Sequence, residues 1–291
     1  MRLPRDAVAG SPVDLVVQAP AIAREDLAIL AALTDAEAVL PVAGAATEAY
    51  RLHDIRHDDG VAEASTAGGY DWALVPPSRR RDRVRLVAMD MDSTLITIEC
   101  IDEIADLAGV KPQVAAITSS AMRGEIDFRA SLTRRVALLA GLPVAALETV
   151  YTDRLTLSPG AQTLLDGFAK VGAKTLLVSG GFTFFTERLK SRLGIDYALG
   201  NELEIADGTL TGRVIGDIVD AAAKARMFRQ RAQALRGDDG LTLAIGDGAN
   251  DVPMLDEADI SVAYRAKPIV RTRATHAIDH CGLDAVLNLF A

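Results

Sequence analysis

The chain has 291 residues, of which 49% are hydrophobic and 24% charged, the composition of a globular protein of one or two domains. Lysine and arginine number 31 and aspartate and glutamate 40, so the net charge of −9 disfavours nucleic acid as a partner. Two cysteines without a CxxC pair exclude a disulfide framework and a zinc ribbon. We find neither a run of about 18 apolar residues nor the apolar segment of a signal peptide, so we expect a cytoplasmic protein without a membrane partner.

The first 80 residues predict a small α+β domain. Alternating apolar residues indicate strands at 13–18, 38–42 and 72–75, and an amphipathic pattern indicates a helix at 25–33. Two prolines and the basic run RRRDRVR (79–85) follow, and together they predict a solvated linker rather than a contact with nucleic acid.

From residue 84 onward, strands alternate with helices. The runs RLVAM (85–89), TLLVS (175–179) and TLAIG (242–246) are typical of parallel strands buried on both faces. We therefore predict an α/β doubly wound parallel sheet over residues 84–291, with ligands bound beyond the carboxyl ends of its strands.

Two segments depart from this alternation. Residues of about 99–157 are mostly helical in pattern, and such an insert at the mouth of an α/β site is a candidate cap. Alternation and the Asp207-Gly208 pair indicate a β-hairpin within 198–218.

The first strand run leads into Asp90-Met91-Asp92-Ser93-Thr94, which places two carboxylates at a strand end. The two charges repel unless a cation lies between them, and Mg²⁺ accepts such oxygen ligands. One carboxylate is a candidate nucleophile, and its neighbour is a candidate acid/base if its pKa is raised. The spacing does not fit an EF-hand, but on this motif alone a DxD that binds the metal of a nucleotide sugar stays open.

Two further motifs follow the other strand runs. Gly246-Asp247-Gly248-Ala249-Asn250-Asp251 supplies two more carboxylates on a glycine-rich turn, and Lys224 could compensate their charge. Ser179-Gly180-Gly181 predicts an anion site of a hydroxyl and backbone N–H groups at a helix N-terminus, with Ser179 a candidate N-cap as well.

Taken in order, DxDST (90–94), Ser179, Lys224 and GDGAND (246–251) resemble the motifs of the haloacid dehalogenase-like (HAD) phosphatases, and within them of the phosphoserine phosphatases. The resemblance covers about residues 84–291 and extends to Glu99 and to SLTRRV at 131–136. The first 80 residues resemble the ACT-like amino-acid-binding module that precedes some of these enzymes, but they show no clear ligand signature.

The resemblance implies a role for each acid. Asp90 would attack phosphorus and form an aspartyl-phosphate, and Asp92 would protonate the leaving oxygen and then activate water. Mg²⁺ would be held by the Asp90 carboxylate, the backbone carbonyl of Asp92 and Asp247. Asp251 would orient Lys224 or a metal-bound water.

The resemblance also implies the substrate contacts. The groups that would bind the phosphate or the substrate are Ser179, the N–H of Gly180, Lys224 and Asn250. In the cap, Glu99 would pair with the substrate ammonium and Arg135 with its carboxylate, in a closed and largely dry site. Met122 and Phe128 would wall the pocket. Arg134 is the rival of Arg135, and the phase of the helix must choose between them.

The implied activity is Mg²⁺-dependent hydrolysis of O-phosphoserine, the last step of serine synthesis. Two alternatives stay open. The first is a related phosphatase or phosphotransferase for another small phosphomonoester, and the second is an amino-acid sensor that works through its N-terminal domain. A homodimer is a further option that the sequence leaves open.

Two other features are interpreted as structural. His276 and His280 are four residues apart but flank a strand-like stretch, which disfavours a second metal site. Cys100 adjoins Glu99, but nothing in the sequence activates its thiol.

Overall fold

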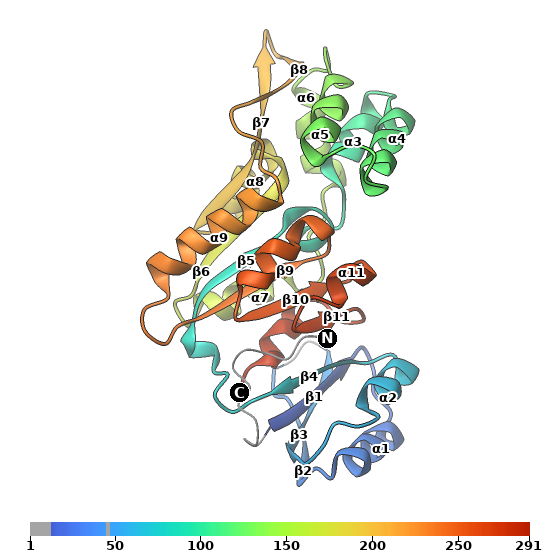
Figure 1. Cartoon of the computed structure of the whole chain (residues 1–291), viewed down its shortest axis with the longest axis vertical. Helices are drawn as coiled ribbons and strands as arrows, with labels where there is room; N and C mark the ends of the chain where they lie inside the picture. The colour runs from blue at the N-terminus through green and yellow to red at the C-terminus, as the bar shows by residue number, and fades with distance from the viewer. Residues whose placement is uncertain (1–12, 45–46) are drawn as a thin grey trace.

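The structure, a computed structural model, describes residues 13–44 and 47–291. Its strands form two separate sheets, a smaller one from the N-terminal part of the chain and a larger one from the rest (Figure 1). The larger sheet is almost entirely parallel and is flanked by helices. The predicted fold class, an α/β sheet preceded by a small α+β domain, is confirmed by this topology.

The N-terminal sheet is antiparallel and has the strand order β2-β3-β1-β4. Its elements in chain order are β1 (Val13–Ala19), α1 (Arg24–Thr34), β2 (Ala38–Pro41), β3 (Glu48–Ile55), α2 (Val61–Gly68) and β4 (Asp71–Val75). Leu27 and Leu30 of α1 pack with Leu15 and Val17 on one face of the sheet. The neighbouring Val16 belongs to the core of the larger domain, so the second face of the sheet packs against that domain.

The larger sheet has the strand order β11-β10-β9-β5-β6-β7-β8. Its strands are β5 (Val84–Met89), β6 (Lys174–Phe182), β7 (Tyr197–Ala206), β8 (Thr209–Ile215), β9 (Leu241–Gly246), β10 (Ile260–Tyr264) and β11 (His276–Ile278). Val87 and Met89 of β5 pack into one core, whereas Leu86 and Ala88 pack into the other. The central strand is therefore buried on both faces, as its unbroken apolar run predicts.

Helices cover both faces of this sheet. They are α7 (Ala161–Ala169), α8 (Thr183–Leu193), α9 (Ala221–Leu235), α10 (Val252–Glu257), α11 (Pro268–Arg271) and the C-terminal 3₁₀ segment η5 (Leu283–Leu289). Across residues 13–44 and 47–291, we find no helix that is long and apolar enough to cross a membrane.

A helical group stands beyond the carboxyl ends of the parallel strands, at the top of Figure 1. It contains α3 (Cys100–Leu107), α4 (Lys111–Met122), α5 (Phe128–Ala137), α6 (Ala145–Thr149) and a final turn, η3 (Val150–Arg154). The chain enters and leaves this group through two segments that lie side by side, because Ile96 and Leu157 form an antiparallel bridge. We propose this group as the cap, at about residues 99–157 of a second domain that begins near residue 84.

The β7–β8 hairpin reaches up to the cap (Figure 1). Leu210 at its tip accepts a hydrogen bond from the N–H of Gly141 (2.8 Å) and donates one to the carbonyl of Leu142 (2.9 Å). Gly212 has a φ of +82°, and a Cβ there would lie 2.9 Å from the Cβ of Ala140, so only glycine fits this approach. The hairpin thus gives the cap a third connection to the core.

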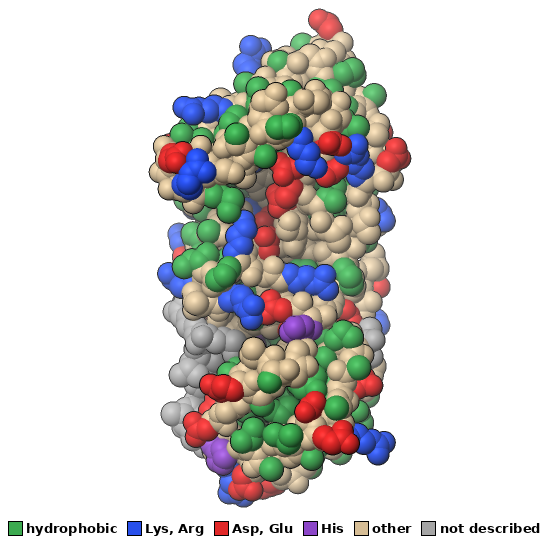
Figure 2. Space-filling model, turned by 90° about the vertical axis from the view of Figure 1, so that its right-hand side faces the viewer, with side chains coloured by type: hydrophobic (Ala, Val, Ile, Leu, Met, Phe, Trp, Pro, Cys, Tyr) green, Lys and Arg blue, Asp and Glu red, His purple; other side chains and the backbone are tan. Residues whose placement is uncertain are grey.

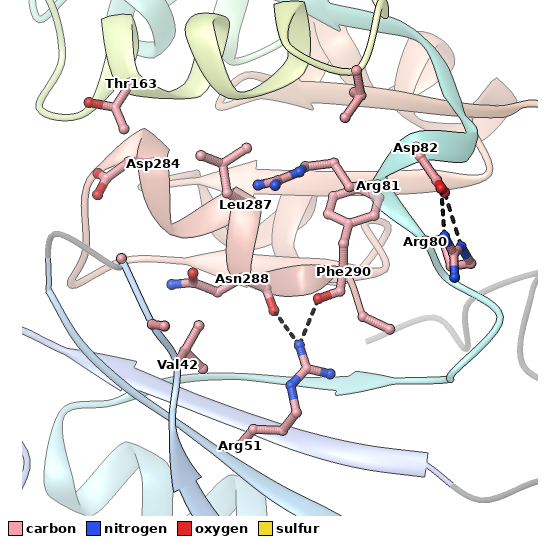
Figure 3. Close-up of a pocket in the computed structure, with 14 residues that line it drawn as sticks. Val42, Arg51, Arg80, Arg81, Asp82, Thr163, Asp284, Leu287, Asn288 and Phe290 are labelled. Atoms are coloured by element: carbon pink, nitrogen blue, oxygen red, sulfur yellow. Dashed lines mark hydrogen bonds and ion pairs between the residues drawn. The ribbon is translucent and has the colours of Figure 1, made fainter.

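The two sheets meet at the C-terminal segment of the chain (Figure 3). Arg51 of β3 donates hydrogen bonds to the carbonyls of Asn288 (3.4 Å) and Phe290 (2.6 Å). Asp71 at the start of β4 accepts the N–H of Cys281 at 2.9 Å. A cavity of about 490 Å³ lies beside the contacts of Arg51 with Asn288 and Phe290. Backbone groups of one domain are therefore satisfied by side chains of the other.

The prediction of a solvated run over 79–85 is wrong at Val84, which begins β5, and at Arg79, because both residues are fully buried. The guanidinium of Arg79 donates to the carbonyl of Leu74 (3.1 Å) and contacts Nε2 of His276 (2.9 Å). A guanidinium can only donate, so this ring nitrogen accepts and His276 is neutral. Burial, together with the charge of Arg79, lowers the pKa of His276 well below its ordinary value.

We expect this histidine to make folding sensitive to acid. A base whose pKa is depressed in the folded state binds more protons when unfolded, so stability is lost as the pH falls below about 6.5. His276→Gln keeps an acceptor for Arg79 and does not titrate there. Between about pH 7.5 and 5.5, the wild type should lose about 1.4 kcal/mol more unfolding free energy than this variant. Urea denaturation of both proteins at the two pH values measures the difference, and equal losses would contradict the assignment.

Candidate active site

Asp90 follows β5, the central strand, and is only 5% exposed. Its Oδ1 accepts the N–H of Met91 (2.7 Å) and contacts the ammonium of Lys224 (2.8 Å). Burial and the neighbouring Asp251 carboxylate raise the pKa of Asp90 well above its ordinary value, and Lys224 only partly opposes them. Oδ1 is held by these two donors, which leaves Oδ2 as the oxygen available for chemistry.

Asp92 lies in a tight turn, η2 (Met91–Leu95), in which Ser93 takes a positive φ of 55°. This left-handed residue turns the chain back under the cap, and the Asp92 carboxylate accepts the N–H of Cys100 at 3.1 Å. Burial, with a contribution from the Glu99 charge, raises the pKa of Asp92 to about 7. A carboxyl group with this pKa can both donate and accept a proton near neutral pH.

Two further carboxylates follow β9, which pairs with β5 in the sheet. Asp247 accepts a hydrogen bond from Thr94 (3.1 Å), and burial raises its pKa to about 6 with a further contribution from Asp251. Asp251 is fully buried, and its two oxygens contact Lys224 (2.8 Å) and the N–H of Gly248 (3.0 Å).

Lys224 lies on the first turn of α9 and contacts two of these acids. Burial alone would lower the pKa of Lys224, but Asp251 and Asp90 outweigh it and raise that pKa above its ordinary value. Carboxylate oxygens of Asp90, Asp247 and Asp251 lie within 4.8 Å of one another. One ammonium cannot neutralise three carboxylates, so the cluster has the charge and the oxygen donors that suit a divalent cation.

Ser179 is buried in β6, and its hydroxyl accepts the N–H of Gly181 at 2.8 Å. The strand continues to Phe182, and α8 begins only at Thr183, so the prediction of a helix N-terminus with Ser179 as its N-cap is wrong. Two adjacent glycines can remain extended here, and the apolar Phe182 then ends the strand in the core.

The glycines after Ser179 allow close approach of other groups. A Cβ on Gly180 would lie 3.0 Å from the ring of Phe128, and one on Gly181 would lie 2.9 Å from Oδ2 of Asp92. The amide of Asn201 donates to the carbonyl of Gly180 at 2.8 Å, which fixes the orientation of this peptide. The backbone here thus lies directly beside the catalytic candidates.

The cap supplies Arg135 from α5. Its side chain is half-buried, and burial lowers its pKa, while the charges of Asp102, Glu99 and Asp92 act in the opposite direction. Arg134 is exposed and does not line the cavity.

The cap side of the site is open to solvent. Glu99 precedes α3, is exposed and accepts a hydrogen bond from Ser93 at 2.7 Å. Met122 lines the cavity but is 69% exposed, whereas Phe128 is half-buried. The expectation of a closed and dry site therefore does not describe this conformation, in which the mouth is open.

These groups surround one cavity of about 320 Å³ between the cap and the strand ends. Figure 2 shows acidic side chains in the hollow below the cap, with basic side chains beside them. The sequence-predicted residues that line it are Asp90, Asp92, Glu99, Met122, Phe128, Arg135, Ser179, Gly180, Asp247 and Asn250. Lys224 and Asp251 lie behind the wall, in contact with Asp90 and Gly248 respectively.

Sequence reasoning missed several residues of this site, of which four make or border its polar contacts. Ser93 and Thr94, which bind Glu99 and Asp247, lie inside the DxDST motif and could have been found there. Asn201 and Lys267 come from β7 and from the segment after β10, and they have no local sequence signal.

Comparison with known proteins identifies the family. The family model of haloacid dehalogenase-like hydrolases matches residues 87–256. The chain belongs to this family. It is 53% identical over 221 residues to the phosphoserine phosphatase of Polaromonas sp. (strain JS666), covering 74% of this chain and 94% of that protein.

Solved structures agree with this assignment. A probable phosphoserine phosphatase from Vibrio cholerae, in unliganded form, has a TM-score of 0.81 at 35% identity, covering 95% of this chain and 85% of that one. A substrate-bound phosphoserine phosphatase has a TM-score of 0.66 at 37% identity, covering 72% of this chain and 99% of that one.

Proposed function

We propose that this chain is a phosphoserine phosphatase, which hydrolyses O-phospho-L-serine to L-serine and phosphate. The observation that carries the proposal is that one cavity combines two acids for phosphoryl transfer with two opposite charges that suit an amino acid. Asp90 and Asp92 face it from the core, and Glu99 and Arg135 face it from the cap. A zwitterionic amino acid needs one charge of each sign, whereas a sugar phosphate needs neither. The curated relatives with this name support the same conclusion.

The two core acids divide the chemistry. Oδ2 of Asp90 attacks phosphorus, and the bond to the serine oxygen breaks as Asp92 donates a proton to that oxygen. Asp92 then takes a proton from water, which attacks the aspartyl-phosphate and releases phosphate with Asp90 restored. A pKa of about 7 suits Asp92 to both steps.

The phosphoryl group is held by groups around Asp90. Ser179, Gly180 and Asn250 line the cavity, and Lys224 lies beside Asp90. We assign them to the phosphoryl oxygens, because phosphoryl transfer depends chiefly on positioning and charge neutralisation.

A divalent cation fits the acidic cluster. As the family resemblance implies, Asp90 and Asp247 would hold Mg²⁺ with the backbone carbonyl of Asp92, and Asp251, whose two oxygens contact Lys224 and the N–H of Gly248, would orient Lys224. Bound there, Mg²⁺ would neutralise charge on the phosphoryl oxygens and on Asp90. Thr94 keeps the Asp247 carboxylate turned toward this position.

A phosphate-release assay tests the proposed function. The substrates are O-phospho-L-serine, its threonine homologue, several sugar phosphates and para-nitrophenyl phosphate, each with Mg²⁺ and with excess chelator. We expect the highest kcat/KM for phosphoserine and no turnover with chelator. A sugar phosphate as the preferred substrate would contradict the assignment of Glu99 and Arg135.

Arg135→Ala is expected to impair phosphoserine selectively. Removing one partner of a buried charge pair costs about 2–5 kcal/mol, and Arg135 is only half-buried, so we expect the lower end, a loss of roughly 30-fold in kcat/KM. Para-nitrophenyl phosphate has no carboxylate, so its kcat/KM should change little. The measurement is the ratio of the two kcat/KM values.

Arg134→Ala is the matched control, because it removes the same charge one residue away on the exposed side of α5. Both substrates should be nearly unaffected. Equal losses on the two substrates in Arg135→Ala would mean that Arg135 holds the cap or the phosphate rather than the carboxylate.

A further inference from the structure

The wall of the active-site cavity carries more acid than base. Its acidic lining residues are Asp90, Asp92, Glu99 and Asp247, and its basic lining residues are Arg135 and Lys267. Lys224 is 1% exposed and lies behind Asp90, so its charge reaches a phosphoryl group only once that group is seated beside Asp90. Apart from the proposed Mg²⁺, the cations that the described lining offers to an entering phosphate dianion are therefore Arg135 and Lys267.

Lys267 is the cation on the core side of this cavity. It precedes α11, and its backbone N–H donates to the carbonyl of Asp247 at 3.1 Å. This bond places the Cα of Lys267 beside the turn that carries Asp247 and Asn250. The ammonium also counteracts the burial that raises the pKa of Asp247, so its charge acts on the interior of the cavity.

The side chain of Lys267 is exposed. Within residues 13–44 and 47–291, its ammonium makes no ion pair or hydrogen bond. The ordinary role of such a lysine is solvation, but this one faces the hollow that holds the nucleophile. Its position differs from that of Arg135, which comes from the cap and faces Asp102, Glu99 and Asp92.

We propose that Lys267 is a substrate-binding residue that draws the phosphate dianion past the acidic rim and holds it on the side of Asn250. The inference rests on the proposed phosphatase function, but it concerns the phosphate group alone. It therefore predicts an effect on every phosphomonoester, whatever the rest of the molecule. Because the interaction is an exposed charge with a dianion, it should weaken with ionic strength.

The experiment compares Lys267→Gln and Lys267→Arg with Lys170→Gln, which removes the same charge from an exposed lysine at the end of α7. KM and kcat are measured for phosphoserine and for para-nitrophenyl phosphate at about 0.02 M and about 0.5 M salt, where the Debye length falls from roughly 20 Å to about 4 Å. Calorimetric binding of inorganic phosphate gives a readout that does not need turnover.

At low salt, Lys267→Gln should raise KM for both substrates and weaken phosphate binding, each by roughly 3- to 30-fold. The difference from wild type should largely disappear at high salt. Lys267→Arg keeps the charge and should stay within about twofold of wild type, and Lys170→Gln should match wild type throughout.

Four results would overturn the proposal. The first is an unchanged KM and phosphate affinity in Lys267→Gln at low salt, and the second is a loss in that variant confined to kcat. The third is a rise in its KM that persists at high salt. The fourth is an equal rise in KM in Lys170→Gln. Recovery of the loss on raising Mg²⁺ would also count against it, because Lys267 would then act only through Asp247.

The proposed substrate can fail independently of this inference. If the wild type hydrolyses para-nitrophenyl phosphate but not phosphoserine, the assigned substrate is wrong. The para-nitrophenyl phosphate and inorganic phosphate measurements then still decide the role of Lys267.

Discussion

Asp90→Asn is expected to lower phosphoserine turnover by about 10⁴- to 10⁶-fold, the order of loss seen when a nucleophile is removed from an enzyme. An amide oxygen is a poor nucleophile, and the variant also loses a charged ligand for Mg²⁺. The buried carboxylate is the one acid that follows the central strand directly and contacts Lys224, so no neighbour can replace it without moving the backbone. Phosphate release under saturating Mg²⁺ measures the loss.

The fold should survive this change. Because burial and Asp251 raise the pKa of Asp90, its ionised form costs folding free energy at neutral pH, and a neutral amide removes that cost. We expect an unchanged or higher Tm, since Lys224 keeps Asp251 as a partner. Activity above a few per cent, in protein that mass spectrometry shows to be free of deamidation, would exclude the aspartyl-phosphate route.

The sequence of the apolar strand segments predicts that Asp90 and Asp247 lie close together. Asp90 and Asp247 each follow an unbroken apolar run, and the carboxyl ends of parallel strands meet at one edge of a sheet. What the pattern does not contain is the strand order. β5 ends at Met89 and β9 begins at Leu241, and no local periodicity encodes that strands so far apart in the chain are neighbours in the sheet.

Helical phase separates the two cap arginines but does not by itself choose between them. Leu132 and Val136 are buried in the cap, and Ser131 and Arg135 occupy the adjacent stripe at the same spacing of four. Arg134 falls on the opposite side. The phase shows that Arg134 and Arg135 lie on different faces of α5. Only the elements packed against α5 show which of these faces meets the cavity.

Other features had no sequence signal. The strand β3 (EAYRLHDI) alternates poorly, and α2 (VAEASTAG) is composed largely of small residues and ends in glycine, so neither was predicted. Arg79 is buried because it contacts His276, 197 residues away, and a basic run on its own predicts solvation. These interactions arise from tertiary contacts that override local composition.

Asp92→Asn is expected to reduce phosphoserine turnover by about 10²- to 10⁴-fold, through loss of proton transfer rather than of metal binding. Its proposed contact with Mg²⁺ is the backbone carbonyl, which the substitution leaves in place. The amide oxygen can still accept the N–H of Cys100, which keeps the turn intact. Half-saturation by Mg²⁺ should therefore stay within a few-fold of wild type.

A second substrate separates the two tasks of Asp92. The para-nitrophenolate group leaves readily without a proton, so the variant should still form the aspartyl-phosphate from para-nitrophenyl phosphate. It lacks the base for the second step, so rapid mixing should reveal a burst of nitrophenol followed by a slow steady state. Phosphoserine, which needs the proton to leave, should give no burst. If the first step slows equally for both substrates, Asp92 acts on the phosphate and not on the leaving group. If the Mg²⁺ concentration for half-saturation rises tenfold, Asp92 acts on the metal.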